Sequence, residues 1–178
     1  MNLGIDNANG KYIGVVETDD YRRFTIADIP GLIEGAHDNV GLGHAFLRHI
    51  ERCRIFCFVL DMAGTDGRDP LDDLASLRNE LAMYEPALAE RKSILLANKM
   101  DMPESEENLK RLQKSEGKDT IIIPICAELK ENTQEVINQL RTILDTLPPL
   151  DENYLNQILA KRRFLKEIEL KNNYDDEW

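Results

Sequence analysis

One stretch decides the fold of this chain: SILLANKMD, at residues 93–101. A short apolar run that ends in turn-forming polar residues is typical of a parallel strand covered on both faces. Two more runs of this kind lie at 54–60 and 120–125. Helical patterns alternate with these runs at 70–84, 104–115 and 132–147. Strands that alternate with helices predict an α/β fold with a mainly parallel sheet.

The N-terminal part adds a different pattern. Residues 12–17 and 23–27 flank a turn, which predicts a β-hairpin. Near the other end, Pro148 and Pro149 mark a boundary, since proline cannot continue a helix. We therefore divide the chain into a domain at 1–147 and a C-terminal extension at 148–178, which predicts one more helix and an acidic tail.

The composition is that of an ordinary soluble protein, with 42% hydrophobic and 31% charged residues. No apolar run reaches the roughly 18 to 20 residues that span a bilayer, so no membrane partner is expected. The net charge of −11 opposes tight binding to nucleic acid, and we expect no sequence-specific DNA contact. Cys53, Cys57 and Cys126 have no metal-type spacing, which favours reduced thiols in a cytoplasmic protein.

Polar residues at the ends of the predicted strands are the candidate site residues, because open α/β sheets bind ligands there. Asp28, Ile29, Pro30 and Gly31 follow the strand at 23–27. An aspartate that leaves a strand can hold a magnesium ion through water. Gly31 lets a backbone N–H approach a phosphate oxygen.

Asn98, Lys99, Met100 and Asp101 follow the strand at 93–97. The carboxylate of Asp101 can accept hydrogen bonds from both the N1–H and the exocyclic amine of guanine. Adenine lacks that pair of donors and would leave the carboxylate unpaired, at a cost on the order of a few kcal/mol. Asn98 can tie neighbouring loops together, and the stem of Lys99 can cover one face of the base.

Cys126, Ala127 and Glu128 follow the last predicted strand, where a backbone N–H can meet the guanine carbonyl. The alternative interpretation is that all three segments are strand-terminating turns. The order of Asp-x-x-Gly and Asn-Lys-x-Asp, about 70 residues apart and each after an apolar strand, favours a nucleotide site. Asp61, which ends another strand, more simply caps a turn than binds a metal.

Residues 28–51, DIPGLIEGAHDNVGLGHAFLRHIE, closely resemble the switch II region of the Obg family of GTPases. The resemblance runs from about Tyr12 to Leu147. It implies a three-layer, P-loop-NTPase-like (Ras-like) G domain with GTP and GDP as ligands, Mg²⁺ as cofactor and hydrolysis of GTP to GDP. It also implies association with the large ribosomal subunit during assembly. In that family the Asp-x-Pro-Gly element senses the γ-phosphate and magnesium, and the Asn-Lys-x-Asp element selects guanine.

The sequence departs from the family pattern at its phosphate loop, Gly-x-x-x-x-Gly-Lys-Ser/Thr. The segment from Gly4 to Tyr12 has five residues between its glycines, and Tyr12 stands where a serine or threonine is needed. The switch I threonines are absent as well. Cys126 replaces a serine, which puts a hydroxyl contact in doubt. Leu32 stands where Ras-like proteins place a water-orienting glutamine, which implies slow hydrolysis.

These departures predict a G domain that is incomplete at its N-terminus, as a truncated or wrongly delimited gene product or a part of a longer protein. Phosphoryl transfer depends on positioning and charge neutralisation, so we expect little GTPase activity and weak nucleotide affinity from the chain alone. Without the strand before the phosphate loop, two inner strands must pair directly, recruit another segment or leave edges exposed. A non-enzymatic interaction module and a fragment that does not fold alone stay open as alternatives.

Overall fold

The computed structural model describes residues 13–29, 50, 52–65, 67–84, 86–147, 156 and 160. Its strands are β1 (Ile13–Glu17), β2 (Arg23–Ala27), β3 (Phe56–Asp61), β4 (Ser93–Asn98) and β5 (Ile122–Pro124). Its helices are α2 (Pro70–Tyr84), α3 (Pro86–Ala89), α4 (Ser105–Glu116) and α5 (Thr133–Thr146).

Several predicted features lie outside the described residues. The segment from Gly4 to Tyr12, which precedes β1, is one of them. The others are the candidate site residues Pro30 and Gly31, the position of Leu32, and the boundary at Pro148 and Pro149. The division into 1–147 and 148–178 therefore stays a prediction.

The main sheet has three parallel strands in the order β3-β4-β5, which confirms the prediction of an α/β fold with a mainly parallel sheet. The pairing of β3 with β4 ends at Asp61↔Asn98, and that of β4 with β5 ends at Ala97↔Pro124. Parallel pairing brings the carboxyl ends of all three strands to one edge of the sheet. The segments that follow β3, β4 and β5 therefore start next to one another.

Strands β1 and β2 form a separate antiparallel hairpin, as predicted, with Val16 opposite Phe24. Among the described strands, no hydrogen-bonded ladder joins this hairpin to β3. The sequence left three alternatives for the inner strands, and one of them was that these strands pair directly with each other. Among the described strands, the hairpin and β3 do not pair in this way.

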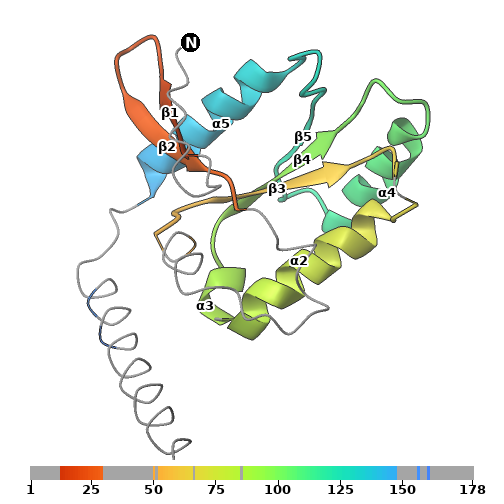
Figure 1. Cartoon of the computed structure of the whole chain (residues 1–178), viewed down its shortest axis with the longest axis horizontal. Helices are drawn as coiled ribbons and strands as arrows, with labels where there is room; N and C mark the ends of the chain where they lie inside the picture. The colour runs from red at the N-terminus through yellow and green to blue at the C-terminus, as the bar shows by residue number, and fades with distance from the viewer. Residues whose placement is uncertain are drawn as a thin grey trace, which may run out of the picture.

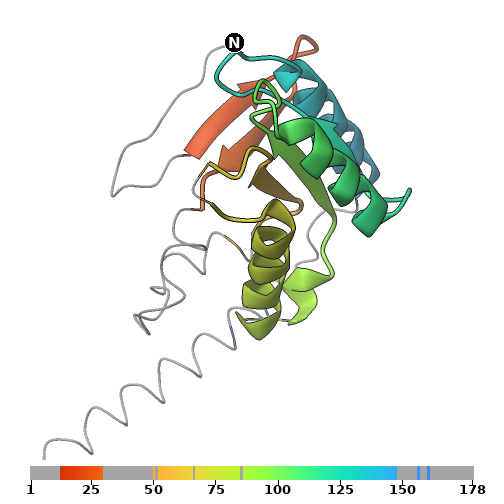
Figure 2. The ribbon, with the colours of Figure 1, turned by 90° about the vertical axis from the view of Figure 1, so that its right-hand side faces the viewer.

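The hairpin is attached to helix α5 through side chains. Arg22 donates two hydrogen bonds of 2.8 Å to the carboxylate of Asp145, and Arg141 pairs with Asp20. Both ribbon views show the hairpin and α5 together, away from α2 and α3 (Figures 1 and 2). Helix α5 thus links the two sheets.

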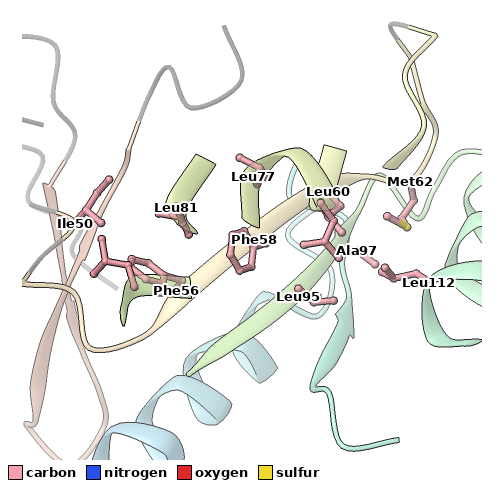
Figure 3. Close-up of a cluster of buried hydrophobic side chains, with 12 residues drawn as sticks. Ile50, Phe56, Phe58, Leu60, Met62, Leu77, Leu81, Leu95, Ala97 and Leu112 are labelled. Atoms are coloured by element: carbon pink, nitrogen blue, oxygen red, sulfur yellow. The ribbon is translucent and has the colours of Figure 1, made fainter. Parts of the chain in front are cut away.

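The larger part of the core lies between the parallel sheet and helices α2, α3 and α4 (Figure 3). Helix α2 contributes Leu74, Leu77 and Leu81, whose spacing places them on one helical stripe. The other buried members of this cluster are Ile50, Phe56, Phe58, Leu60, Met62, Leu88, Leu95, Ala97 and Leu112. Helix α2 begins as the sequence predicts, because the carboxylate of Asp69 accepts the N–H of Leu71 at 2.9 Å and Pro70 needs no partner.

The opposite face of the sheet packs on α5. A second buried cluster there consists of Ile94, Leu96, Ile123, Ile125 and Leu140. Strand β4 is therefore covered on both faces, as predicted.

Strand β3 corrects the same prediction. Its residues alternate, with Phe56, Phe58 and Leu60 buried whereas Cys57 is exposed and Val59 is 53% exposed. The physical reason is that α5 lies over β4 and β5 and leaves this face of β3 open.

No helix in the described part of the chain is long and apolar enough to cross a membrane.

Candidate functional site

The candidate site lies at the edge where β3, β4 and β5 end. Asp61 closes β3 and pairs in register with Asn98, the last residue of β4. Two backbone hydrogen bonds continue the sheet into the loops, from Met62 N to Asn98 O at 3.0 Å and from Met100 N to Ile125 O at 3.2 Å. These bonds hold the loops after β3, β4 and β5 next to one another beyond the end of the sheet.

The side chain of Asn98 connects two of these loops. Its Oδ1 accepts the backbone N–H of Ala127 at 3.0 Å. This contact confirms the prediction that Asn98 ties neighbouring loops together. It also occupies a backbone N–H in the segment 126–128, where the sequence predicts a donor to the guanine carbonyl, so a ligand would have to share that donor or replace Asn98 as its acceptor.

Asp101 and Cys126 are brought into direct contact. The buried thiol of Cys126 donates a hydrogen bond to Oδ1 of Asp101 over 3.0 Å. This bond to a carboxylate is the main reason why the pKa of Cys126 is raised, and a raised pKa keeps the thiol protonated as a donor. Asp101 is exposed, and within the described residues its Oδ2 accepts no hydrogen bond.

The loop around Cys126 and Ala127 is closed on itself. The N–H of Glu131 donates to Cys126 O at 2.9 Å, and the N–H of Cys126 donates back to Glu131 O at 3.3 Å. Glu128 lies within this loop and is exposed. The short loop keeps the thiol of Cys126 within hydrogen-bond distance of Asp101.

Lys99 adopts a left-handed backbone conformation with φ of 63°. Its Nζ donates to Oδ2 of Asp61 at 2.8 Å and to Oγ1 of Thr65 at 2.7 Å. The backbone carbonyl of Lys99 accepts the hydroxyl of Ser105 at 2.5 Å. The lysine is thus fixed at its backbone and at its charged end.

Asp61 caps a turn, as predicted. Its carboxylate accepts the backbone N–H of Ala63 at 2.9 Å and that of Thr65 at 3.2 Å. Partial burial raises the pKa of Asp61, but hydrogen bonds from Lys99, Thr65 and Ala63 outweigh it and lower the pKa to about 2. With its oxygens engaged in this way, Asp61 does not offer a metal site.

The phosphate side of the predicted site is described only in part. Asp28 is exposed just beyond β2, and Ile29 packs against the core cluster on the α2 face. Pro30 and Gly31 lie outside the described residues. In the ranges that the structure covers, no group of three or more His, Cys, Asp or Glu side chains is placed to hold a metal ion. A lone exposed carboxylate fits a hydrated Mg²⁺ that takes its remaining ligands from water and phosphate.

The fold thus brings together Asn98, Asp101 and Cys126, whose role as nucleotide-binding residues stays a prediction. The sequence did not predict the partnership of Asp61 with Lys99 or the hydrogen bond from Cys126 to Asp101. The contact between Asp61 and Lys99 could have been predicted from the pairing of Asp61, at the end of β3, with Asn98, the residue before Lys99. That pairing depends on strand register, which a single sequence does not fix.

A sequence profile of the family described as 50S ribosome-binding GTPases matches residues 9–99. The chain is 50% identical over 150 residues to GTPase Obg of Geobacillus thermodenitrificans (strain NG80-2), covering 84% of this chain and 35% of that protein. It is 48% identical over 136 residues to GTPase Obg of Lysinibacillus sphaericus (strain C3-41), covering 76% of this chain and 32% of that one. The chain thus spans about a third of the length of these relatives.

Among solved structures, the chain is similar to Era in complex with MgGDPNP and nucleotides 1506–1542 of 16S ribosomal RNA. The identity is 22% and the TM-score 0.54, over 79% of this chain and 45% of that one. It is also similar to an Aquifex aeolicus Era variant bound to GDP·AlF₄⁻, with 22% identity and a TM-score of 0.53, over 84% of this chain and 50% of that one. These likenesses support the predicted G-domain fold.

Proposed function

Because the chain belongs to the 50S ribosome-binding GTPase family and is similar to GTPase Obg, we propose that its strand-end site binds the base of a guanine nucleotide. The observation that carries this proposal is the placement of Asp101. Its carboxylate lies in the turn after β4, with Oδ1 held by the thiol of Cys126 and Oδ2 without a donor among the described residues.

A carboxylate in this position selects its base by its acceptors. Guanine offers two neighbouring donors, the N1–H and the exocyclic amine, whereas adenine offers none in that arrangement. A hydrogen bond to a charged group contributes about 1.5–3 kcal/mol, so the pair favours guanine strongly. Cys126 supports this selection by limiting the rotation of the carboxylate.

The loop after β5 supplies the donor for the guanine carbonyl in this proposal. The N–H of Ala127 lies beside the site, bonded to Asn98 at 3.0 Å. An N–H can be shared between two acceptors, so the base carbonyl can approach it without breaking the link to Asn98. Met100 and Glu128 complete the rim of the site. The stem of Lys99 covers one face of the base.

The phosphates belong on the side of Asp28, Ile29, Pro30 and Gly31. Asp28 would hold Mg²⁺ through water, and the ion would neutralise phosphate charge when bound. We propose that the complete protein hydrolyses GTP to GDP in the cytoplasm and acts on the large ribosomal subunit. This chain alone is expected to turn over little GTP, because the segment from Gly4 to Tyr12 departs from the phosphate-loop pattern.

Calorimetric titration with GDP and with ADP tests the proposal. We expect measurable binding of GDP and a clear preference over ADP, because only GDP presents two donors to Asp101. Absent binding by a chain with a cooperative thermal transition would instead favour an interaction module, and equal binding of GDP and ADP would overturn the proposed base selection. A chain without a thermal transition would favour a fragment that does not fold alone. Turnover close to that of a complete Obg protein would refute the expected loss of activity.

A further inference from the structure

The side chain of Lys99 is fixed at both of its ends. At the backbone, its carbonyl accepts the N–H of Met102 at 3.1 Å and the hydroxyl of Ser105 at 2.5 Å. At the far end, Nζ donates to Asp61 over 2.8 Å and to Thr65 over 2.7 Å. The four-carbon stem is therefore stretched from the end of β4 to the turn after β3.

The acceptors that hold Lys99 are themselves rigid. The hydroxyl of Thr65 donates to Oδ2 of Asp61 at 2.5 Å, which orients its oxygen as an acceptor for the ammonium group. The turn is closed by Gly64 N to Asp61 O at 3.2 Å. Gly64 has φ of +60°, and a Cβ there would lie 2.9 Å from the carbonyl oxygen of Arg68. The turn at 61–65 thus has little room to rearrange.

The backbone of Lys99 also points to a positioning role. A left-handed φ of 63° is uncommon for a residue with a side chain and is retained only where its surroundings fix it. Here the conformation starts the stem beside Asp101, two residues on. A lysine that pointed freely into solvent would lose rotamer freedom whenever a planar ring packed on its stem.

We propose that Asp61 and Thr65 are positioning residues that hold the stem of Lys99 in place as one wall of the base site. This inference rests on the proposed function, since it assigns the wall to the same guanine site. The ordering cost of a long side chain is met on folding instead of on binding. Loss of the two acceptors should therefore weaken base binding about three- to tenfold.

A structural ion pair without this role would give a different pattern, so the test needs two readouts. The variants are Asp61→Asn, which removes the charge, and Thr65→Val, which removes the hydroxyl at nearly constant shape. Thr65→Ser keeps the hydroxyl. Asp73→Asn is the matched control, because Asp73 pairs with Arg68 at 2.7 Å and does not contact Lys99.

The first readout is the ε-methylene signal of Lys99 in ¹H–¹³C spectra of lysine-labelled protein, and the second is GDP affinity by calorimetry. In the wild type we expect two separate ε-proton signals for a fixed side chain. They should merge in Asp61→Asn and Thr65→Val, together with the three- to tenfold loss of affinity. Thr65→Ser and Asp73→Asn should keep both signals and stay within about twofold of wild-type affinity.

Unchanged GDP affinity in a folded Asp61→Asn or Thr65→Val protein would overturn the positioning role. Unmerged Lys99 signals in both variants would show that Asp61 and Thr65 do not hold the stem, and merged signals in the wild type would overturn the fixed stem itself. A wild-type chain that binds GDP no better than ADP is a separate result, since it overturns the proposed function before any variant is compared. If Asp61→Asn fails to fold, Thr65→Val gives the same two readouts.

Discussion

Replacing Asp101 by asparagine gives the sharpest test of base recognition. Asparagine keeps an Oδ1 acceptor for the thiol of Cys126, so the loop after β5 should retain its position. Its amide group, however, places two N–H donors where guanine also presents donors. The substitution removes one hydrogen bond to a charged group and adds a repulsive donor pair.

The magnitude follows from those contacts. One lost charged hydrogen bond is worth about 1.5–3 kcal/mol, and an opposed donor pair adds about 1–3 kcal/mol of unsatisfied polar groups. GDP affinity should fall by about a hundredfold or more. Xanthosine diphosphate carries a carbonyl in place of the exocyclic amine, so it should bind Asp101→Asn better than GDP does.

The assay is a calorimetric titration of both proteins with GDP and xanthosine diphosphate. Asp119→Asn is the matched control. Asp119 is exposed in the loop before β5, so its substitution makes the same change of charge away from the site. Thermal melting of all three proteins confirms that they are folded. Equal preference for GDP in wild type and Asp101→Asn would remove Asp101 from the base site.

Four further results are expected. Because a hydroxyl is a stronger donor than a thiol, Cys126→Ser should raise GDP affinity and Cys126→Ala should lower it; the reverse order in calorimetry would contradict the orienting role. Asp61→Asn should cost about 1–2 kcal/mol at pH 7, since the pKa of Asp61 is lowered from 3.8 to about 2. A lowered pKa stabilises the fold above pH 4 and loses that effect as the pH falls towards 2, so urea unfolding should show the two proteins converge there. Gly64→Ala should lower the free energy of unfolding by about 1–3 kcal/mol, because φ is left-handed and the new Cβ would lie 2.9 Å from the carbonyl oxygen of Arg68. An unchanged urea midpoint would show that the turn adapts. Leu95→Ala should cost about 2–5 kcal/mol and Val59→Thr less than about 1 kcal/mol, because Leu95 is fully buried and Val59 is 53% exposed; similar thermal shifts would contradict the open face of β3.

The sequence predicted those features that depend on short patterns. The apolar run before Asn98 identified β4, and the order of polar residues after the strands identified the edge that Asp101 and Cys126 share. The sequence also predicted that Asn98 ties neighbouring loops together, but it did not identify Ala127 as the partner. These inferences need only the direction of the strands and their position in the chain.

Features that depend on packing between distant segments were missed. The exposure of Cys57 and Val59 depends on where α5 lies, which the apolar run of β3 does not report. The contact between Lys99 and Asp61 joins residues 38 apart and depends on the register of β3 against β4. Strand register and helix placement are tertiary properties, so a strand pattern alone cannot supply them.

The attachment of the hairpin to α5 has a consequence for folding. Its two charged contacts join residues 121 and 123 positions apart, Asp20 with Arg141 and Arg22 with Asp145. Such distant contacts close loops of more than 120 residues and are expected to form late. The described ladders of the parallel sheet do not include the hairpin, so β1 and β2 can detach without breaking them. In hydrogen exchange, the hairpin amides should therefore open as a unit of lower stability than β4, and more readily at high salt.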